Sequence, residues 1–207
     1  MAVIEIDKLT KDYGNKKGIF DVSFSVNRGE VVGFLGSNGA GKTTTIRHLM
    51  GFISPQKGRA QILDMDCFCN ASCVQEQVGY LPGEIAFMDN MSGKEFIEFM
   101  AKMKKIKNLT YARELTEYLE IDTRVKIKKM SKGMKQKIGL IIAFMQNAPI
   151  LILDEPTTGL DPIMQNKFVE LIKREKASGK TILMSSHIFE EVENTCDRIV
   201  MIKDGKI

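Results

Sequence analysis

Residues 36–43 read Gly36-Ser37-Asn38-Gly39-Ala40-Gly41-Lys42-Thr43, a glycine followed by four variable positions and then by Gly-Lys-Thr. The preceding segment, Glu30–Leu35, is largely apolar, as in a buried strand, and the following Thr44–Met50 continues as a helix. A glycine-rich turn between a strand and a helix brings backbone N–H groups and the positive end of the helix dipole to one point. This combination predicts a phosphate-binding loop.

The end of this loop carries the residues with the most specific expected roles. Lys42 is expected to reach the β- and γ-phosphates of a nucleotide, and the hydroxyl of Thr43 to bind Mg²⁺. The competing explanation is an accidental glycine-rich turn, which the flanking strand and helix argue against. The predicted nucleotide-binding positions of the loop are Gly36, Ser37, Asn38, Gly39, Ala40, Gly41, Lys42, Thr43 and Thr44.

Length and composition indicate one globular domain that does not cross a membrane. The 207 residues can bury a substantial core, and 30 lysines and arginines against 26 acidic residues give a net charge of +4. That charge is too small to indicate nucleic-acid binding by itself. Met1–Glu5 meets a charge at once, so we expect no signal peptide. The longest uncharged run, Ile138–Leu153, is shorter than the roughly 20 apolar residues of a membrane span, and the four cysteines are expected to be free thiols.

A local excess of basic residues marks the second half of the chain. The segment Thr123–Leu153 contains seven lysines and arginines and no acidic residue. Within it, Ser131 is placed as the N-cap of a helix expected over Met134–Met145, next to glycine and lysine. Such a helix start predicts a second anion site, suited to the phosphates of a nucleotide. Nucleic acid, anionic lipid and a solvated basic face are the alternatives.

Two adjacent carboxylates follow a predicted buried strand. The run Ile150–Leu153 is apolar and follows Pro149, as expected for a strand of a parallel sheet, and Asp154 and Glu155 come directly after it. Ligands of open α/β sheets bind at the carboxyl ends of the strands. We therefore expect Asp154 to hold Mg²⁺ through water and Glu155 to act as general base on an attacking water. An acidic turn without catalytic function is the alternative.

The next predicted strand, Thr181–Met184, leads to the same edge of the sheet. It is followed by two serines and His187, which is therefore a candidate sensor of the γ-phosphate. The other histidine, His48, lies inside a predicted helix and is expected to be structural. Asp161 is the expected N-cap of a helix that has proline at its first position.

The remaining periodicities predict a small antiparallel sheet and a helical region. Alternation indicates strands at Ala2–Leu9 and Ile19–Val26, and helical spacing dominates Ser92–Ile121, which opens with a capping box. Near the C-terminal end, Ile188–Cys196 is expected to be a helix and Arg198–Ile202 a strand, followed by a hairpin turn.

In their order, these motifs resemble those of the ATP-binding cassette family, the nucleotide-binding subunits of ABC transporters. The resemblance covers essentially the whole chain and implies ATP and Mg²⁺ as ligands and ATP hydrolysis as the activity. Walker A corresponds to Gly36–Thr43, Walker B to Ile150–Asp154 with the catalytic Glu155 after it, the D-loop to Thr158–Asp161, and the switch histidine to His187. Asp161 thereby joins the implied nucleotide-binding positions.

The resemblance also implies the architecture. The expected fold is an α/β P-loop NTPase, with a mostly parallel core sheet, a small antiparallel β subdomain and a helical subdomain. Residues 1–207 would form a single ABC ATPase domain. Its core and β subdomain would occupy approximately residues 1–83 and 147–207, and its helical subdomain approximately residues 84–146.

Some implied positions depart from the family pattern. The signature Leu-Ser-Gly-Gly-Gln corresponds to residues 130–134, where Ser131 and Gly133 are retained and the glutamine is lost. The Q-loop glutamine is replaced by Gly83, so Glu84 is expected to take its place at the metal. A lone tyrosine in a loop is by itself more typical of a partly buried anchor, but Tyr13 falls where the family has its adenine-stacking aromatic residue, so the resemblance implies the stacking role.

The family mechanism implies partners. Two cassettes would close head to tail around two ATP molecules, each held by Walker A of one subunit and by Ser131 and Gly133 of the other. The second cassette would be a further copy of this chain or another ATP-binding subunit. A separate transmembrane permease would contact the helical subdomain and Leu81–Asn90, with this chain cytoplasmic and peripheral on the inner face of the membrane. The residues after Ser131 resemble the branch that serves drug, antibiotic and lipid exporters, whose subunits often continue beyond such a final strand.

Other functions remain as alternatives. One is a soluble ABC-type ATPase that acts on nucleic acid or ribosomes through Arg124–Lys137. Such proteins usually carry a coiled-coil insertion or a second cassette, which this sequence lacks, so no direct nucleic-acid contact is expected. Another is a small-molecule kinase, which would need mobile arginines over the phosphates and would leave Ser131 without a role. A third is a regulatory cassette that does not hydrolyse ATP.

Overall fold

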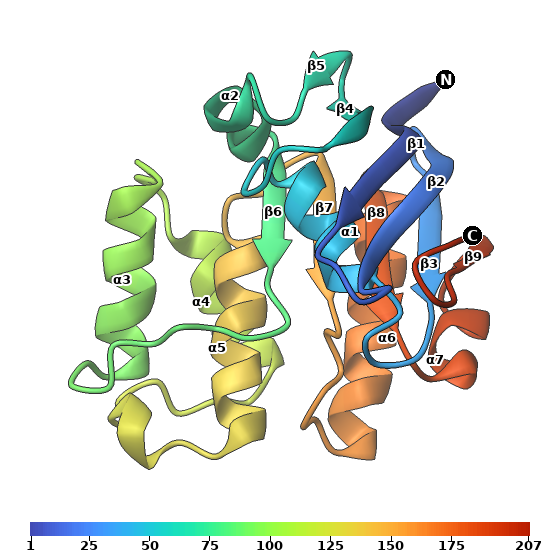
Figure 1. Ribbon diagram of the computed structural model, residues 1–207. Helices are drawn as coiled ribbons and strands as arrows, with labels where there is room; N and C mark the ends of the chain where they lie inside the picture. Colours follow the sequence, from blue (N-terminus) through green and yellow to red (C-terminus); the bar gives the residue numbers. More distant parts are fainter.

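The computed structural model describes residues 1–207, which form two β-sheets covered by helices (Figure 1). The larger sheet consists of β3 (Val31–Leu35), β6 (Val78–Leu81), β7 (Ile150–Asp154), β8 (Thr181–Ser186) and β9 (Arg198–Met201). These five strands lie in the order β6-β7-β8-β3-β9, and every neighbouring pair is parallel. The parallel core sheet expected from the sequence is confirmed.

The parallel strands are apolar throughout because both of their faces are buried. Along β7, Ile150 and Ile152 belong to one hydrophobic core, whereas Leu151 and Leu153 belong to the other. A strand buried on both faces loses the apolar–polar alternation of a half-exposed strand. The short apolar runs in the sequence therefore identified these strands correctly.

The expected antiparallel sheet is also present and has four strands. They are β1 (Ala2–Asp12), β2 (Gly18–Asn27), β4 (Lys57–Ile62) and β5 (Met65–Asp66), in the order β2-β1-β4-β5. One core lies between this sheet, the helix α1 (Lys42–Leu49) and one face of the parallel sheet. This packing fixes the loop before α1 at the carboxyl end of β3.

Helices cover the other face of the parallel sheet and extend beyond it. The helices of the chain besides α1 are α2 (Ala71–Glu76), whose Val74 belongs to the first core, and α3 (Gly93–Met103), α4 (Thr110–Tyr118), the short 3₁₀ helix η1 (Ile127–Lys129), α5 (Lys132–Phe144), α6 (Pro162–Ala177) and α7 (Phe189–Glu193). Figure 1 shows α3, α4 and α5 grouped at one side of the molecule. The second core joins these helices and α6 to the sheet. None of the helices combines the length and the apolar character needed to span a bilayer.

Several expected boundaries are corrected by the structure. α5 begins at Lys132 rather than Met134, because the Ser131 side chain accepts a hydrogen bond from the Met134 N–H and the helix starts directly after this cap. β8 continues to Ser186 because its pairing with β3 does so. α7 ends at Glu193 instead of Cys196, since Thr195 turns back to the Val192 carbonyl.

His48 is buried on α1, in agreement with the structural role expected for it. Its Nδ1 lies 2.8 Å from the Thr44 carbonyl oxygen, and burial lowers the pKa of the imidazole from its ordinary 6.5. Between the lowered pKa and about pH 6.5, the His48 imidazole binds a proton in the unfolded chain but not in the folded chain. The folded state is therefore favoured by neutral His48 above about pH 6.5, and this part of its stability is lost as the pH falls.

We expect the free energy of unfolding in urea to be smaller at about pH 5.5 than at about pH 7.5, with part of that difference absent from His48→Gln. Glutamine does not titrate, so the variant removes this single proton-binding difference. An identical pH dependence in the variant would contradict the assignment.

Candidate active site

The loop of residues 36–43 joins β3 to α1 as the sequence predicts. Gly39 and Gly41 have φ angles of 82° and 116°, in the left-handed region that favours glycine. A Cβ atom on Gly36 would lie 2.5 Å from the Ile202 carbonyl oxygen, whereas the Cβ position of Gly39 borders open space. The backbone thus forms the glycine-dependent turn that a phosphate cradle requires.

Lys42 lies inside this turn. Its buried ammonium group donates hydrogen bonds to the carbonyl oxygens of Gly36, at 2.5 Å, and Ser37, at 3.2 Å. The same Nζ atom is 3.1 Å from Glu155 Oε1. The positive charge is therefore held between the loop and the turn after β7.

Asp154 occupies the carboxyl end of β7 and is fully buried. The Thr43 hydroxyl donates to Asp154 Oδ2 at 2.8 Å, and the Ser185 hydroxyl donates to Asp154 Oδ1 at 2.5 Å. The hydroxyl and carboxylate oxygens at this point are the ligand type that Mg²⁺ prefers. The pairing of Thr43 with Asp154 brings together two predicted metal ligands that are 111 residues apart in the sequence.

Glu155 lies between two cationic or ionisable side chains. Its Oε2 atom is 2.7 Å from His187 Nδ1, at the end of β8, and its Oε1 atom faces Lys42. The backbone of Glu155 has a φ of 52°, a left-handed conformation that turns the chain sharply after the strand. The structure thus gathers Lys42, Thr43, Asp154, Glu155 and His187, as the sequence analysis expects.

Two positions assigned by resemblance are exposed, and no hydrogen bond or ion pair joins them to this cluster. Tyr13 is 55% exposed in the loop between β1 and β2. Glu84 is exposed and makes no hydrogen bond or ion pair with Thr43 or Asp154. It is Gly83 that lies beside the predicted metal ligand, since a Cβ on it would be 3.1 Å from Asp154 Oδ2. The roles of Tyr13 and Glu84 stay predictions.

Ser131, Gly133 and Asp161 belong to a different part of the surface. Ser131 caps α5 and Asp161 caps α6, where it accepts a hydrogen bond from the Met164 N–H at 3.0 Å. Gly133 packs against the D-loop segment, since a Cβ there would lie 2.6 Å from the Gly159 carbonyl oxygen. No hydrogen bond or ion pair joins these three residues to the loop of residues 36–43.

Comparison with known protein families decides what this site is. A family model described as ABC transporter matches residues 19–158, a range that includes the loop and Asp154 and Glu155. The chain belongs to the ABC transporter family as an ATP-binding domain. It is accordingly an ATP-binding protein and an ATP hydrolase.

Relatives of known name are similar to this ABC ATPase over almost its whole length. The bacitracin transport ATP-binding protein BcrA of Bacillus licheniformis is 37% identical over 209 residues, covering 100% of this chain and 68% of that protein. The ATP-binding protein NatA of Bacillus subtilis is 35% identical, covering 92% and 80%. A solved ATP-binding subunit of an ABC transporter has a TM-score of 0.89 at 31% identity, covering 99% and 88%.

Side chains that the sequence analysis did not predict hold the turn after β7 in this ABC ATPase. Ser185 binds Asp154 and also accepts a hydrogen bond from the Glu155 N–H at 3.0 Å. Glu191 accepts from Thr157 Oγ1 and from Ser186 Oγ, both at 2.7 Å. Gln136, on α5, donates to the turn through its amide. The sequence held one signal for the burial of Gln136, because it lies on the same helical face as the apolar Leu140 and Phe144.

Proposed function

We propose that this ATPase hydrolyses ATP with Glu155 as general base. Lys42 binds the β- and γ-phosphates, and the Glu155 carboxylate accepts a proton from the water that attacks the γ-phosphorus, with ADP as leaving group. His187, hydrogen-bonded to the same carboxylate, holds it in place and contacts the γ-phosphate. The observation that carries this proposal is the position of Glu155 between Lys42 and His187, with 3.1 Å and 2.7 Å contacts.

Thr43 and Asp154 are proposed to hold Mg²⁺, Thr43 directly and Asp154 through water. Their oxygens are 2.8 Å apart at the carboxyl end of β7, beside the phosphate loop, and this all-oxygen donor set fits the ion. When bound, Mg²⁺ neutralises charge on the phosphate oxygens. Ser185 orients the Asp154 carboxylate by its hydrogen bond to the other oxygen.

The second half of each nucleotide site is proposed to come from another cassette. Ser131 and Gly133 open α5, whose N-terminus provides free N–H groups and a partial positive charge for an anion. These residues are not bonded to the phosphate loop of their own chain. A head-to-tail dimer of this chain, or its pairing with a second ATP-binding subunit, brings Ser131 of one subunit to the ATP held by the other.

The proposed work of this dimer is to drive a separate membrane permease in export. Relatives 33–37% identical are named for bacitracin transport, linearmycin resistance and Nod factor export, which supports a drug, antibiotic or lipid as the exported substrate. The same names speak against the alternative of an ATPase that acts on nucleic acid or ribosomes. The chain would then lie at the inner face of the membrane, attached to the permease.

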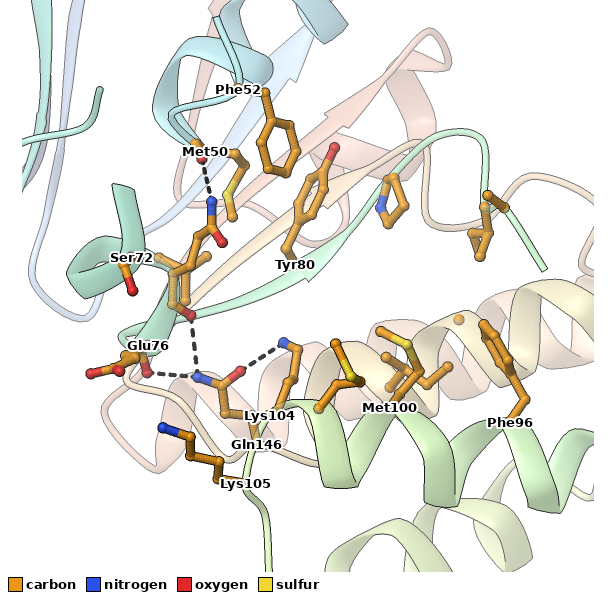
Figure 2. Close-up of a pocket in the computed structure, with 18 residues that line it drawn as sticks. Met50, Phe52, Ser72, Glu76, Tyr80, Phe96, Met100, Lys104, Lys105 and Gln146 are labelled. Carbon is orange, nitrogen blue, oxygen red and sulfur yellow. Dashed lines mark hydrogen bonds between the residues drawn. The ribbon is translucent and has the colours of Figure 1, made fainter. Parts of the chain in front are cut away.

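A cavity of about 550 Å³ between α3 and the core is the proposed permease contact. Figure 2 shows Met50, Phe52 and Tyr80 on one wall and Phe96 and Met100, from α3, on the other. Aromatic and methionine side chains suit an adaptable protein contact. This cavity adjoins the segment Leu81–Asn90, through residues 82, 85 and 86 in its lining.

One end of the cavity carries Lys104, Lys105 and Glu76, two cationic side chains and one carboxylate. Lys104 donates to Gln146 Oε1 at 2.7 Å, and burial lowers the pKa of its ammonium group (Figure 2). Lys105 lines the cavity beside it. An apolar segment with an acidic residue near one end matches this distribution of charge.

The contact is tested by purifying tagged Phe52→Ser from membranes together with the co-expressed permease. Phe52 is 52% exposed in the cavity, whereas Phe68 is 49% exposed outside it, so Phe68→Ser is the matched control. We expect at least about tenfold less permease to be recovered with Phe52→Ser, because truncating an aromatic hot spot at an interface costs about 2 kcal/mol or more. The ATPase activity of this variant without permease should be unchanged. Equal recovery with the two variants would contradict this assignment of the cavity.

A further inference from the structure

A side chain from α5 holds the turn that carries Glu155. The Gln136 amide nitrogen donates to the carbonyl oxygens of Glu155, at 3.2 Å, and Pro156, at 2.9 Å. Gln136 is buried, with 7% of its surface exposed. Among the side chains of residues 84–146, it alone hydrogen-bonds residues 154–157. The amide of Gln136 therefore provides the only side-chain hydrogen bonds between residues 84–146 and the turn that carries Glu155.

The turn depends on this support. Glu155 has the left-handed φ of 52°, which a residue with a side chain adopts only when its surroundings hold it there. Pro156 is buried, and no backbone N–H donates to its carbonyl oxygen. Without the Gln136 amide this carbonyl would be buried and unpaired, which drives the surrounding backbone to rearrange. A rearrangement of the backbone at Pro156 would also move Glu155, the residue before it in the chain.

We propose that Gln136 is a positioning residue for ATP hydrolysis, which keeps the Glu155 carboxylate aligned with the attacking water. It does not contact the nucleotide in this role. Loss of its two hydrogen bonds lets the turn relax and misaligns the base, and misplacement by about 1 Å can cost roughly a hundredfold in rate.

The place of Gln136 on α5 has a further consequence, which rests on the proposed head-to-tail dimer. α5 starts at the cap Ser131, which in that dimer contacts the partner's ATP, and Gln136 lies little more than one helical turn further on. Gly133, between them, packs on Gly159 of the same D-loop segment. ATP bound against Ser131 therefore acts, through a rigid helix, on the base at the other nucleotide.

The test compares Gln136→Met and Gln136→Glu with wild type in steady-state ATP hydrolysis and in equilibrium ATP binding. Methionine and ionised glutamate resemble glutamine in length but donate no hydrogen bond. We expect kcat to fall about tenfold or more in both variants, with the KM and Kd for ATP within about twofold of wild type. The Hill coefficient for ATP should also move toward 1. Gln61 lies on β4 of the antiparallel sheet and makes no hydrogen bond to the site, so the same change there, Gln61→Met, should leave kcat unchanged.

A wild-type kcat in either Gln136 variant, at native stability in urea, would overturn the positioning role. An equal loss of kcat and ATP affinity would also overturn it, because it would indicate general damage to the nucleotide site. If Gln136→Met fails to fold, Gln136→Glu decides by the same criteria. The proposed dimer is tested separately: if Glu155→Gln forms no dimers with ATP, the dimer is wrong. The positioning role of Gln136 does not depend on that result, because the comparison of kcat values decides it.

Discussion

Replacing Glu155 with glutamine is expected to slow ATP hydrolysis by roughly 100- to 10,000-fold, the usual contribution of a general base. Glutamine keeps the shape of the side chain but cannot accept the proton of the attacking water. Lys42, Thr43 and Asp154 are unchanged, so the Kd for ATP should stay within about threefold of wild type. Phosphate release and equilibrium binding of a fluorescent ATP analogue measure the two quantities.

The matched control is Glu5→Gln, the same change on the exposed outer part of β1, where the carboxylate makes no hydrogen bond or ion pair. This control should hydrolyse ATP at the wild-type rate. Normal turnover by Glu155→Gln would refute Glu155 as the base. The proposed role of His187, which is to hold the Glu155 carboxylate through their 2.7 Å contact, would then also fail.

Replacing Lys42 with alanine is expected to weaken ATP binding about tenfold to a hundredfold. The substitution removes a charged donor, and hydrogen bonds to charged groups contribute about 1.5–3 kcal/mol, where 1.4 kcal/mol corresponds to tenfold in affinity. The variant also leaves Glu155 Oε1 without its cationic neighbour at 3.1 Å, so residual hydrolysis should fall further than binding does. Isothermal titration with ATP measures the loss of affinity.

Lys57→Ala, on exposed β4, is the control for the removal of one lysine, and its ATP affinity should equal that of wild type. Unchanged affinity in Lys42→Ala would contradict the assignment of residues 36–43 as the phosphate loop, because Lys42 is buried within that loop.

The core of the fold was predictable from local sequence signals. β7 and β8 are apolar runs because they are buried on both faces, and the capping box of α3 is formed as expected, with the Ser92 N–H donating to Glu95 Oε2 at 2.6 Å. α2 was not predicted, since its six residues have no side-chain cap and bury only Val74. Elements this short are stabilised by their tertiary contacts, which local sequence does not encode.

The candidate site was predictable where a motif fixes residue type and spacing. Asp154 ends one strand of the parallel sheet, and Lys42 and His187 follow two others, so their convergence at its carboxyl edge follows from topology. The supports were not predictable in this way. Gln136 reaches the Glu155 turn only because α5 packs against it, and the exposure of Glu84 depends on the path of a loop.

The most direct test of the account is the mass of Glu155→Gln in solution, measured by light scattering with and without saturating ATP and Mg²⁺. We expect twice the monomer mass with ATP, the monomer mass without it, and no dimer when Ser131→Arg is added, because arginine would obstruct the start of α5 that receives the partner's nucleotide. A protein that binds ATP with wild-type affinity but stays monomeric would contradict the proposal that two cassettes share each nucleotide.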